Sequence, residues 1–222
     1  MNADELFIAS SSSKYECVPV IDSSTADSPQ FNTAIPTNLV IKGKDAKLSC
    51  HLKALNITSA SFSELTAISN ASGLSYVFSE SGYLTSVSFP ELTTISGNYA
   101  LNSAFYDCAK LTSVSFPKLT TISGNYALNR TFYNCTNLTS VSFPELTTIS
   151  DSYALNSTFY NCANLTSVSF PKLTTVTYPK NAFCQAGSST LTIHLPKALS
   201  NLGITNDNRS NSSSYCRFVY DL

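Results

Sequence analysis

The segment LTSVSFPELTTIS begins at Leu84 and recurs with few changes at Leu111, Leu138 and Leu165, so successive copies are 27 residues apart. A fixed period of this size is typical of solenoids and other repeat arrays. A weaker copy starts at Ile57, and LTIHLPKAL restarts the pattern at 191. The end units are degenerate, as expected where a stack is capped. We therefore predict an N-terminal arm over 1–38, an N-terminal cap over 39–56, units at 57–83, 84–110, 111–137, 138–164 and 165–190, and a partial repeat with a C-terminal cap over 191–222.

Each unit begins with a predicted short strand. In LTSVSF, Val87 and Phe89 alternate with Ser86 and Ser88, and this alternation indicates a strand with one buried face. Pro90 ends the strand because proline has no N–H to give to a ladder. The return segment ELTTIS brings further inward apolar residues, and SGN signals a turn.

The remainder of the unit has a period of four. Ala100, Ala104 and Cys108 are spaced by four residues, and so are Leu101 and Phe105. On a helical wheel these side chains share one face, which predicts two to three turns of helix. The predicted fold class is therefore an α/β repeat solenoid, with a parallel sheet on one face, short helices on the other and about five units.

The repeated pattern resembles the BspA-like leucine-rich repeats of bacterial surface and secreted proteins. The matching positions in the second unit are Leu84, Val87, Phe89, Pro90, Leu92, Ile95, Phe105 and Cys108. The unit here is longer than is usual in that family, and its strand ends in Phe rather than Ile or Val. The resemblance implies a non-enzymatic cell-surface or secreted module that recognises a host or matrix protein or a glycan, with no cofactor. The alternative is a structural spacer that presents another domain and has no ligand of its own.

Composition excludes several classes of partner. Charged residues make up 12% of the chain and the net charge is −1, without a cluster of Lys or Arg that would attract nucleic acid or an anionic membrane. No apolar stretch approaches the length of a transmembrane helix. The first residues lack the basic and then apolar layout of a signal peptide. If the protein is exported, we expect its signal peptide to have been removed from this sequence.

Two columns of equivalent residues have a predicted structural role. Cys108, Cys135 and Cys162 fall at one position of successive units, where parallel side-chain directions oppose disulfides, so we predict buried, reduced thiols and no metal site. The sequence leaves open whether the flanking cysteines form disulfides that tie down the caps; these are Cys17, Cys50, Cys184 and Cys216. The second column alternates in sign and is expected to form exposed ion pairs; its members are Glu91, Lys118, Glu145 and Lys172.

Two further columns are candidate binding surfaces. Pairs of tyrosines seven residues apart share one face of the predicted helix, opposite the Ala and Cys positions. These rings either form an exposed patch for a protein or a glycan or pack flat across neighbouring units; they are Tyr99, Tyr106, Tyr126, Tyr133, Tyr153 and Tyr160. The strand face presents a serine ladder, in which the candidate residues are Ser86, Ser88, Ser113, Ser115, Ser140 and Ser142. No His or Asp accompanies these serines, so we predict no catalytic residue.

Overall fold

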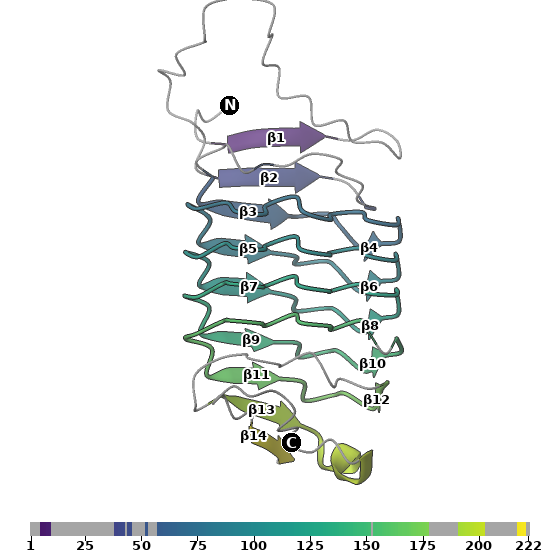
Figure 1. The fold of residues 1–222 in the computed structure, drawn as a ribbon. Helices are drawn as coiled ribbons and strands as arrows, with labels where there is room; N and C mark the ends of the chain where they lie inside the picture. Colours follow the sequence, from purple (N-terminus) through teal and green to yellow (C-terminus); the bar gives the residue numbers. More distant parts are fainter. Residues whose placement is uncertain are drawn as a thin grey trace, which may run out of the picture.

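The chain folds as a parallel β-solenoid whose turns, here called rungs, stack in a column (Figure 1). The computed structural model describes residues 5–9, 38–42, 44, 45, 52, 57–151, 153–177, 191–202 and 217–220. Every strand pair in this part of the chain is parallel, and equivalent residues of successive rungs pair in register. Ser86 pairs with Ser113, for example, and Thr94 pairs with Thr121. The predicted solenoid and its period are thereby confirmed.

The first side of the column carries the strands of the SVS motif. In chain order they are β1 (Glu5–Ala9), β2 (Asn38–Lys42), β3 (Ser59–Phe62), β5 (Ser86–Ser88), β7 (Ser113–Ser115), β9 (Ser140–Ser142), β11 (Ser167–Ser169), β13 (Thr192–Leu195) and β14 (Arg217–Tyr220). β2 lies where a cap strand is expected, and β13 occupies the place of a sixth rung against β11. β1 lies within the segment 1–38 that we named the N-terminal arm.

The second side is a narrow sheet made by the return segments. Its strands are β4 (Ala67–Ile68), β6 (Thr94–Ile95), β8 (Thr121–Ile122), β10 (Thr148–Ile149) and β12 (Thr175–Val176). Near one end of the column a 3₁₀ helix, η1 (Lys197–Leu202), follows β13. The two sheets lie on opposite sides of the column in Figure 1, and the apolar side chains of both point into the space between them.

The core consists of columns of identical residues. The strand valines Val87, Val114, Val141 and Val168 are buried, and so are the strand phenylalanines Phe89, Phe116, Phe143 and Phe170. Rings of successive phenylalanines stack with centroids 4.6–5.4 Å apart, beginning with Phe62 on Phe89. This spacing is close to the distance between neighbouring strands, so one residue per rung fills the interior without gaps. Burial of both predicted columns is confirmed.

The third side was predicted to be helical, and that prediction is wrong. No α-helix occurs in the described residues, and the segment after each narrow strand is a series of tight turns. The N–H groups of Ala100, Ala104 and Cys108 donate to carbonyls three residues back in the same rung. The N–H groups of Asn102 and Tyr106 do the same. The N–H groups at the alternate positions donate instead to the next rung, as Leu101 does to Ala127 (2.7 Å). An α-helix would direct every N–H to the residue four back in its own segment.

Left-handed backbone conformations explain why the period of four misled the prediction. Tyr99, Ser103 and Asp107 have φ of 57°, 52° and 58°, and each is the third residue of a turn that requires positive φ. Such a turn recurs every four residues, so Ala and Leu positions face inward at the same spacing that a helix gives. Asp and Asn tolerate this conformation better than most residues. The hydrogen bonds to the next rung satisfy the remaining N–H groups.

The stack of strands on the first side is interrupted once. The ladder runs β1-β2-β3-β5-β7, and a separate ladder runs β14-β13-β11-β9, so β7 and β9 do not pair. At the intact junction before it, the N–H of Phe89 donates to Ser115 O at 3.0 Å. The corresponding N–H of Phe116 makes no such bond within the described residues. The second sheet continues across the same two rungs, from β8 to β10.

Candidate functional site

The six candidate tyrosines form two ladders of stacked rings. In the first ladder the ring centroids of Tyr99 and Tyr126 lie 5.2 Å apart and those of Tyr126 and Tyr153 lie 5.0 Å apart. The second ladder has spacings of 4.9 Å and 4.5 Å and consists of Tyr106, Tyr133 and Tyr160. The planes are within 13° of parallel in every pair. The rings therefore pack across rungs and still reach solvent, so packing and exposure occur together.

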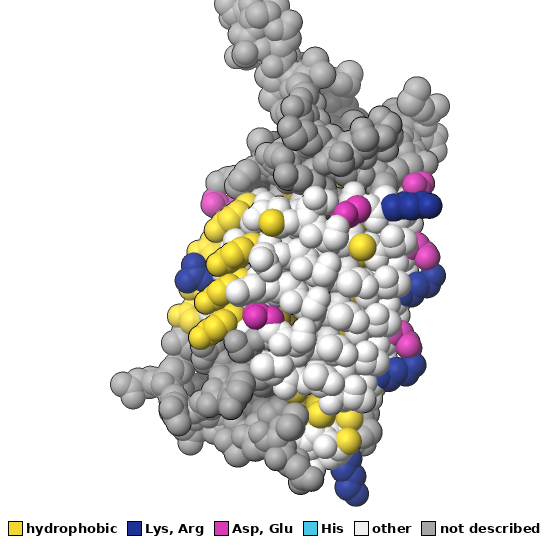
Figure 2. Space-filling view, turned by 90° about the vertical axis from the view of Figure 1, so that its right-hand side faces the viewer, with side chains coloured by type: hydrophobic (Ala, Val, Ile, Leu, Met, Phe, Trp, Pro, Cys, Tyr) yellow, Lys and Arg dark blue, Asp and Glu magenta, His cyan; other side chains and the backbone are white. Residues whose placement is uncertain are grey.

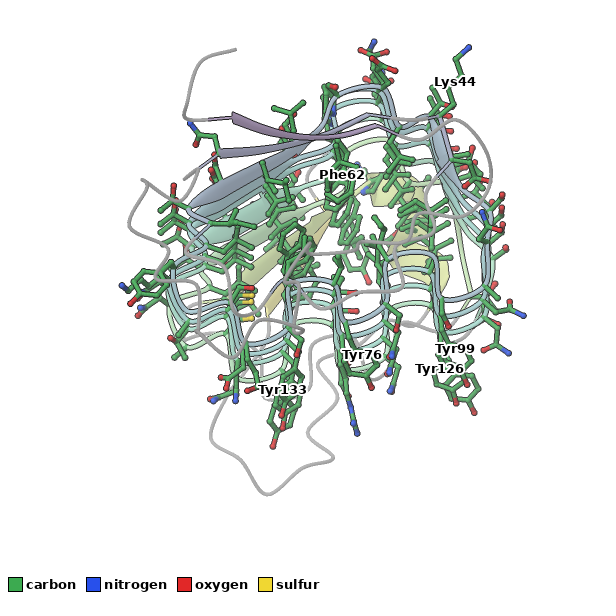
Figure 3. All side chains as sticks on the ribbon, turned by 90° about the horizontal axis from the view of Figure 1, so that it is seen from above. Lys44, Phe62, Tyr76, Tyr99, Tyr126 and Tyr133 are labelled. Atoms are coloured by element: carbon green, nitrogen blue, oxygen red, sulfur yellow. The ribbon has the colours of Figure 1, made fainter. Side chains whose placement is uncertain are left out.

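Both ladders project from the turn side of the solenoid. Figure 3, viewed along the column, shows Tyr99, Tyr126 and Tyr133 pointing away from Phe62 in the interior, with Tyr76 between the two ladders. Tyr99 is 43% exposed and Tyr153 is 47% exposed, while the other four rings of the ladders are half-buried. We call this surface, made of both ladders and the lane between them, the tyrosine face.

Stacking determines which part of each ring a ligand can reach. Each inner ring is covered on both sides by its neighbours, so the ladders offer ring edges and phenol groups rather than open faces. Burial and the neighbouring Tyr160 raise the pKa of Tyr133, so its phenol stays protonated at neutral pH. The ladders thus present neutral, rigid groups that both pack and hydrogen-bond, as tyrosine does in protein interfaces.

A lane of other side chains runs between the ladders. It contains an amide ladder, in which Asn129 Nδ2 donates to Asn102 Oδ1 and Asn156 Nδ2 donates to Asn129 Oδ1, both at 2.7 Å. Exposed Arg130 follows Asn129 in the chain, and Tyr76 occupies its place two rungs earlier. The six-tyrosine prediction missed Tyr76, because its unit has serines at the two predicted ladder positions. Its exposed fraction of 43% equals that of Tyr99.

The strand side presents the predicted serine ladder, which we call the serine face. Ser113, Ser115, Ser140 and Ser142 are exposed, whereas their equivalents on the neighbouring strands, Ser86, Ser88, Ser167 and Ser169, are half-buried. The Oγ–H of Ser88 donates to Ser61 Oγ at 3.0 Å. Within the described chain, the four exposed serine hydroxyls have no hydrogen-bond partner.

The second sheet presents threonines whose hydroxyls are already engaged. Thr93, Thr120 and Thr147 each donate Oγ1–H to a backbone carbonyl of the preceding rung at 3.0–3.1 Å. Figure 2 shows this side as a broad surface almost free of charge and of hydrophobic side chains, with a row of hydrophobic side chains along one edge. The threonine surface therefore stabilises the stack and has few free donors for a ligand.

Alternating charges follow the opposite edge of that surface (Figure 2). Lys118 Nζ lies 2.8 Å from Glu91, and Lys172 Nζ lies 2.7 Å from Glu145. Among the described residues no ion pair joins Lys118 to Glu145, so the charges connect rungs in twos. These groups are about half exposed, and each pair contributes roughly 0–1 kcal/mol.

The predicted column of buried, reduced cysteines is present. Cys108, Cys135 and Cys162 are free and fully buried, and each thiol donates to a backbone carbonyl one rung earlier at 2.9–3.1 Å. Burial raises the pKa of Cys108 and of Cys162 to about 12 and that of Cys135 well above its usual value. The remaining cysteines, Cys17, Cys50, Cys184 and Cys216, lie outside the described residues.

The described residues offer little for metal binding or for crossing a membrane. Over these ranges no three His, Cys, Asp or Glu side chains gather as metal ligands. In the same part of the chain no helix has the length and apolarity of a membrane span. The arrangement is instead suited to contact along extended surfaces, on the tyrosine face and on the serine face.

The fold and these regular side-chain ladders define a solenoid built from leucine-rich repeats. A family model described as "BspA type Leucine rich repeat region" matches six copies, over residues 31–130, 54–185 and 101–208. The chain belongs to this family, as its sequence pattern indicates. Proteins built from such repeats are typically protein-interaction modules without enzymatic activity.

One solved structure is similar to the chain. It is the crystal structure of a leucine-rich repeat protein from Bacteroides ovatus, with 17% sequence identity and a TM-score of 0.36. The match covers 81% of this chain and 54% of that protein, so the chain spans about half the length of the relative. No curated protein matches the chain.

Proposed function

We propose that this chain is an extracellular recognition module that binds a protein partner through its tyrosine face. The observation that carries the proposal is the pair of exposed tyrosine ladders, repeated in register over three rungs. Tyrosine is enriched in the energetically dominant parts of interfaces because it buries a large area with few rotatable bonds. The family adds support, since BspA-type repeats occur in bacterial surface and secreted proteins.

The geometry of the rings favours a protein over a glycan on this face. Sugars pack on the open face of an aromatic ring, but the inner rings of both ladders have their faces covered by neighbours. The exposed edges and phenols suit the mixed apolar and polar surface of a protein. Host or matrix proteins are the partners expected for an adhesin of this family.

The experiment compares two double variants of the purified chain. Tyr126→Ala with Tyr133→Ala removes the middle ring of both ladders, and Thr120→Ser with Thr147→Ser is the control on the opposite sheet. Binding to an array of extracellular matrix and host surface proteins, measured well below the thermal midpoint of each variant, should be lost in the tyrosine variant and retained in the control. Retained binding in the tyrosine variant, or an array without any bound protein, would count against the proposal.

A spacer without a ligand is the competing function. The ion pairs and threonine bonds between rungs make a stiff column, which a spacer also needs. The rings pack across rungs under either function, so the double variant lowers the thermal midpoint in both cases. A spacer has no ligand, so neither the parent chain nor the double variant would bind a protein of the array. The two functions thus differ in whether the parent binds and the double variant loses that binding.

A further inference from the structure

Arg130 is the only charged residue of the tyrosine face. The rungs before and after it have Ser103 and Ser157 at the same position of the repeat. The three rungs of the face read YALNSAFY (99–106), YALNRTFY (126–133) and YALNSTFY (153–160). A single cation therefore distinguishes one rung of a surface that otherwise repeats itself almost unchanged.

This cation lies at the centre of the face in both directions. Along the column, Arg130 belongs to the middle of the three rungs; across it, Arg130 lies between Tyr126 and Tyr133, the middle rings of the two ladders. Tyr76 has the same place in the repeat two rungs earlier, and Figure 3 shows it between the ladders. Binding energy concentrates near the centre of an interface, and Arg and Tyr are among the residue types that contribute most of it.

The fold itself does not depend on the Arg130 side chain. The residue is exposed, and none of the ion pairs in the described part of the chain includes it. Its φ of 52° is the same as that of Ser103 and within one degree of that of Ser157. The turn thus has one backbone conformation with either side chain and does not require arginine. The guanidinium group is therefore available to a ligand.

The surroundings of the guanidinium suit a carboxylate. Burial and the neighbouring Tyr160 raise the pKa of Tyr133, and the charge of nearby Arg130 opposes this rise without cancelling it. The Tyr133 phenol therefore stays protonated and can donate its O–H beside the guanidinium donors. A guanidinium binds a carboxylate through two parallel N–H···O bonds, and such charged bonds are about twice as strong as neutral ones.

One cation among tyrosines favours an acidic protein segment over a polyanion. Nucleic acids and sulfated glycans carry rows of negative charge, which clusters of Lys and Arg bind. The tyrosine face has one such residue, and exposed Asp107 follows Tyr106 at its border. An Asp or Glu side chain brings a single charge, and the apolar or aromatic residues beside it in a protein can cover the exposed ring edges.

We propose that Arg130 anchors the protein partner by binding the carboxylate of an Asp or Glu side chain. This inference rests on the proposed function, which assigns a protein partner to the same face. The two ladders pack on the partner residues that flank the carboxylate. Because the rungs are otherwise so similar, a partner could bind one rung out of place, and a single charged position fixes its register.

A peptide library tests the chemistry of the partner. Random linear peptides displayed on phage are selected on the full chain, and clones that also bind the Tyr126→Ala, Tyr133→Ala variant are removed. The remaining peptides bind through the tyrosine face and should share an Asp or Glu with apolar or aromatic neighbours. Peptides without an enriched acid would overturn this inference and leave the proposed function standing. A selection that leaves no peptide would overturn both.

Matched variants test the anchor with the best selected peptide, made synthetically. Arg130→Ser should weaken its binding, measured by calorimetry, at least about tenfold and leave the thermal midpoint unchanged. Replacement of the peptide's acid by its amide should cause a similar loss on the parent and little further loss on this variant. Lys172→Gln removes the same charge away from the face and should have little effect. Equal losses in the two protein variants would contradict a local anchor.

A displaced cation tests the register. The variant Arg130→Ser, Ser157→Arg keeps the net charge but places the arginine one rung later, at the end of the ladders. Affinity should stay at least about fivefold below that of the parent, since fewer rings then flank the carboxylate. Full recovery would show that the position of the cation is unimportant and would overturn the proposal. Tighter, Arg130-dependent binding of a heparin hexasaccharide than of the peptide would also overturn it, in favour of a sulfated glycan.

Discussion

The rings of Phe89 and Phe116 stack inside the solenoid with centroids 5.0 Å apart and planes within 6° of parallel. The same stack continues into the rungs on either side, so an inner phenylalanine is packed on both faces by its own equivalents. A truncated ring in this position leaves a cavity bounded by two stiff neighbours.

Phe116→Ala should lower the free energy of unfolding by about 3–5 kcal/mol, because a buried aromatic ring is lost and its rigid neighbours cannot fill the cavity. Chemical denaturation measures the change. The neighbouring Ser115→Ala is the control and should stay within about 0.5 kcal/mol, since Ser115 is exposed. A loss below about 1 kcal/mol for the phenylalanine variant would contradict the stacked core.

Gly124→Ala should destabilise the chain by about 1–3 kcal/mol through overpacking. A Cβ at this position would lie 2.1 Å from the backbone carbonyl oxygen of Gly97 in the preceding rung. Gly82→Ala is the matched control, since its Cβ would meet no atom within 4 Å. Thermal unfolding of both variants should therefore separate them, and similar midpoints would mean that the rungs are less closely stacked than described.

The thiols of Cys108, Cys135 and Cys162 should react slowly with iodoacetamide in the native state at about pH 8, because burial keeps them protonated and inaccessible. Peptide mapping by mass spectrometry follows each site separately. Labelling should accelerate together with global unfolding when denaturant is added. Rapid native labelling of these sites, or a disulfide between any two of them, would contradict the buried column.

Stability should fall as the pH rises above about 9, because the folded chain disfavours the thiolates. The pKa of Cys108 and of Cys162 rises from an ordinary value of 9.0 to about 12 on folding. Their neutral form therefore stabilises the fold fully below about pH 9, and this contribution is lost between about pH 9 and 12. Denaturation midpoints at a series of pH values measure the slope. The Cys108→Ala, Cys162→Ala variant controls for other ionising groups and should show a shallower slope.

Ser81→Ala should raise the free energy of unfolding by about 1 kcal/mol. Ser81 occupies the cysteine column of the first rung, is 1% exposed, and its hydroxyl has no hydrogen-bond partner among the described residues. Removal of an unsatisfied buried hydroxyl relieves its desolvation cost. Chemical denaturation of this variant and the parent provides the comparison, and a clear loss of stability would show that the hydroxyl is satisfied in solution.

The strands and the core were predictable because their signals are local and repeated. Alternation of Val87 and Phe89 with serines specifies an inward and an outward face within one short segment, and the period then fixes the register of the next copy. The outward position of Tyr99 and Tyr106 was also predicted, although from a helix that does not form. Both arrangements send residues at those positions away from the Ala and Cys side chains.

Neither the tight turns of the third side nor the missing pairing of β7 with β9 could be predicted from the sequence, for two different reasons. A period of four suits both a helix and a chain of tight turns, and only the backbone shows Ser103 and Asp107 in the left-handed region. The segments around β7 and β9 are nearly identical in sequence to those around the neighbouring strands. Repeats that are so similar in sequence do not show which pair of strands lacks its ladder. Only the structure distinguishes the exposed serines of β7 and β9 from the half-buried serines of β5 and β11.

The two ion pairs described above also affect how such a chain can change in length during evolution. Arrays of this kind gain and lose whole repeats, and each event brings two formerly distant rungs together. Loss of the single rung that carries Lys118 would set Glu91 beside Glu145, whereas loss of two adjacent rungs would keep opposite charges in contact. The cost of one mismatch is small for exposed groups. It nevertheless favours, over many generations, variants that differ by an even number of repeats.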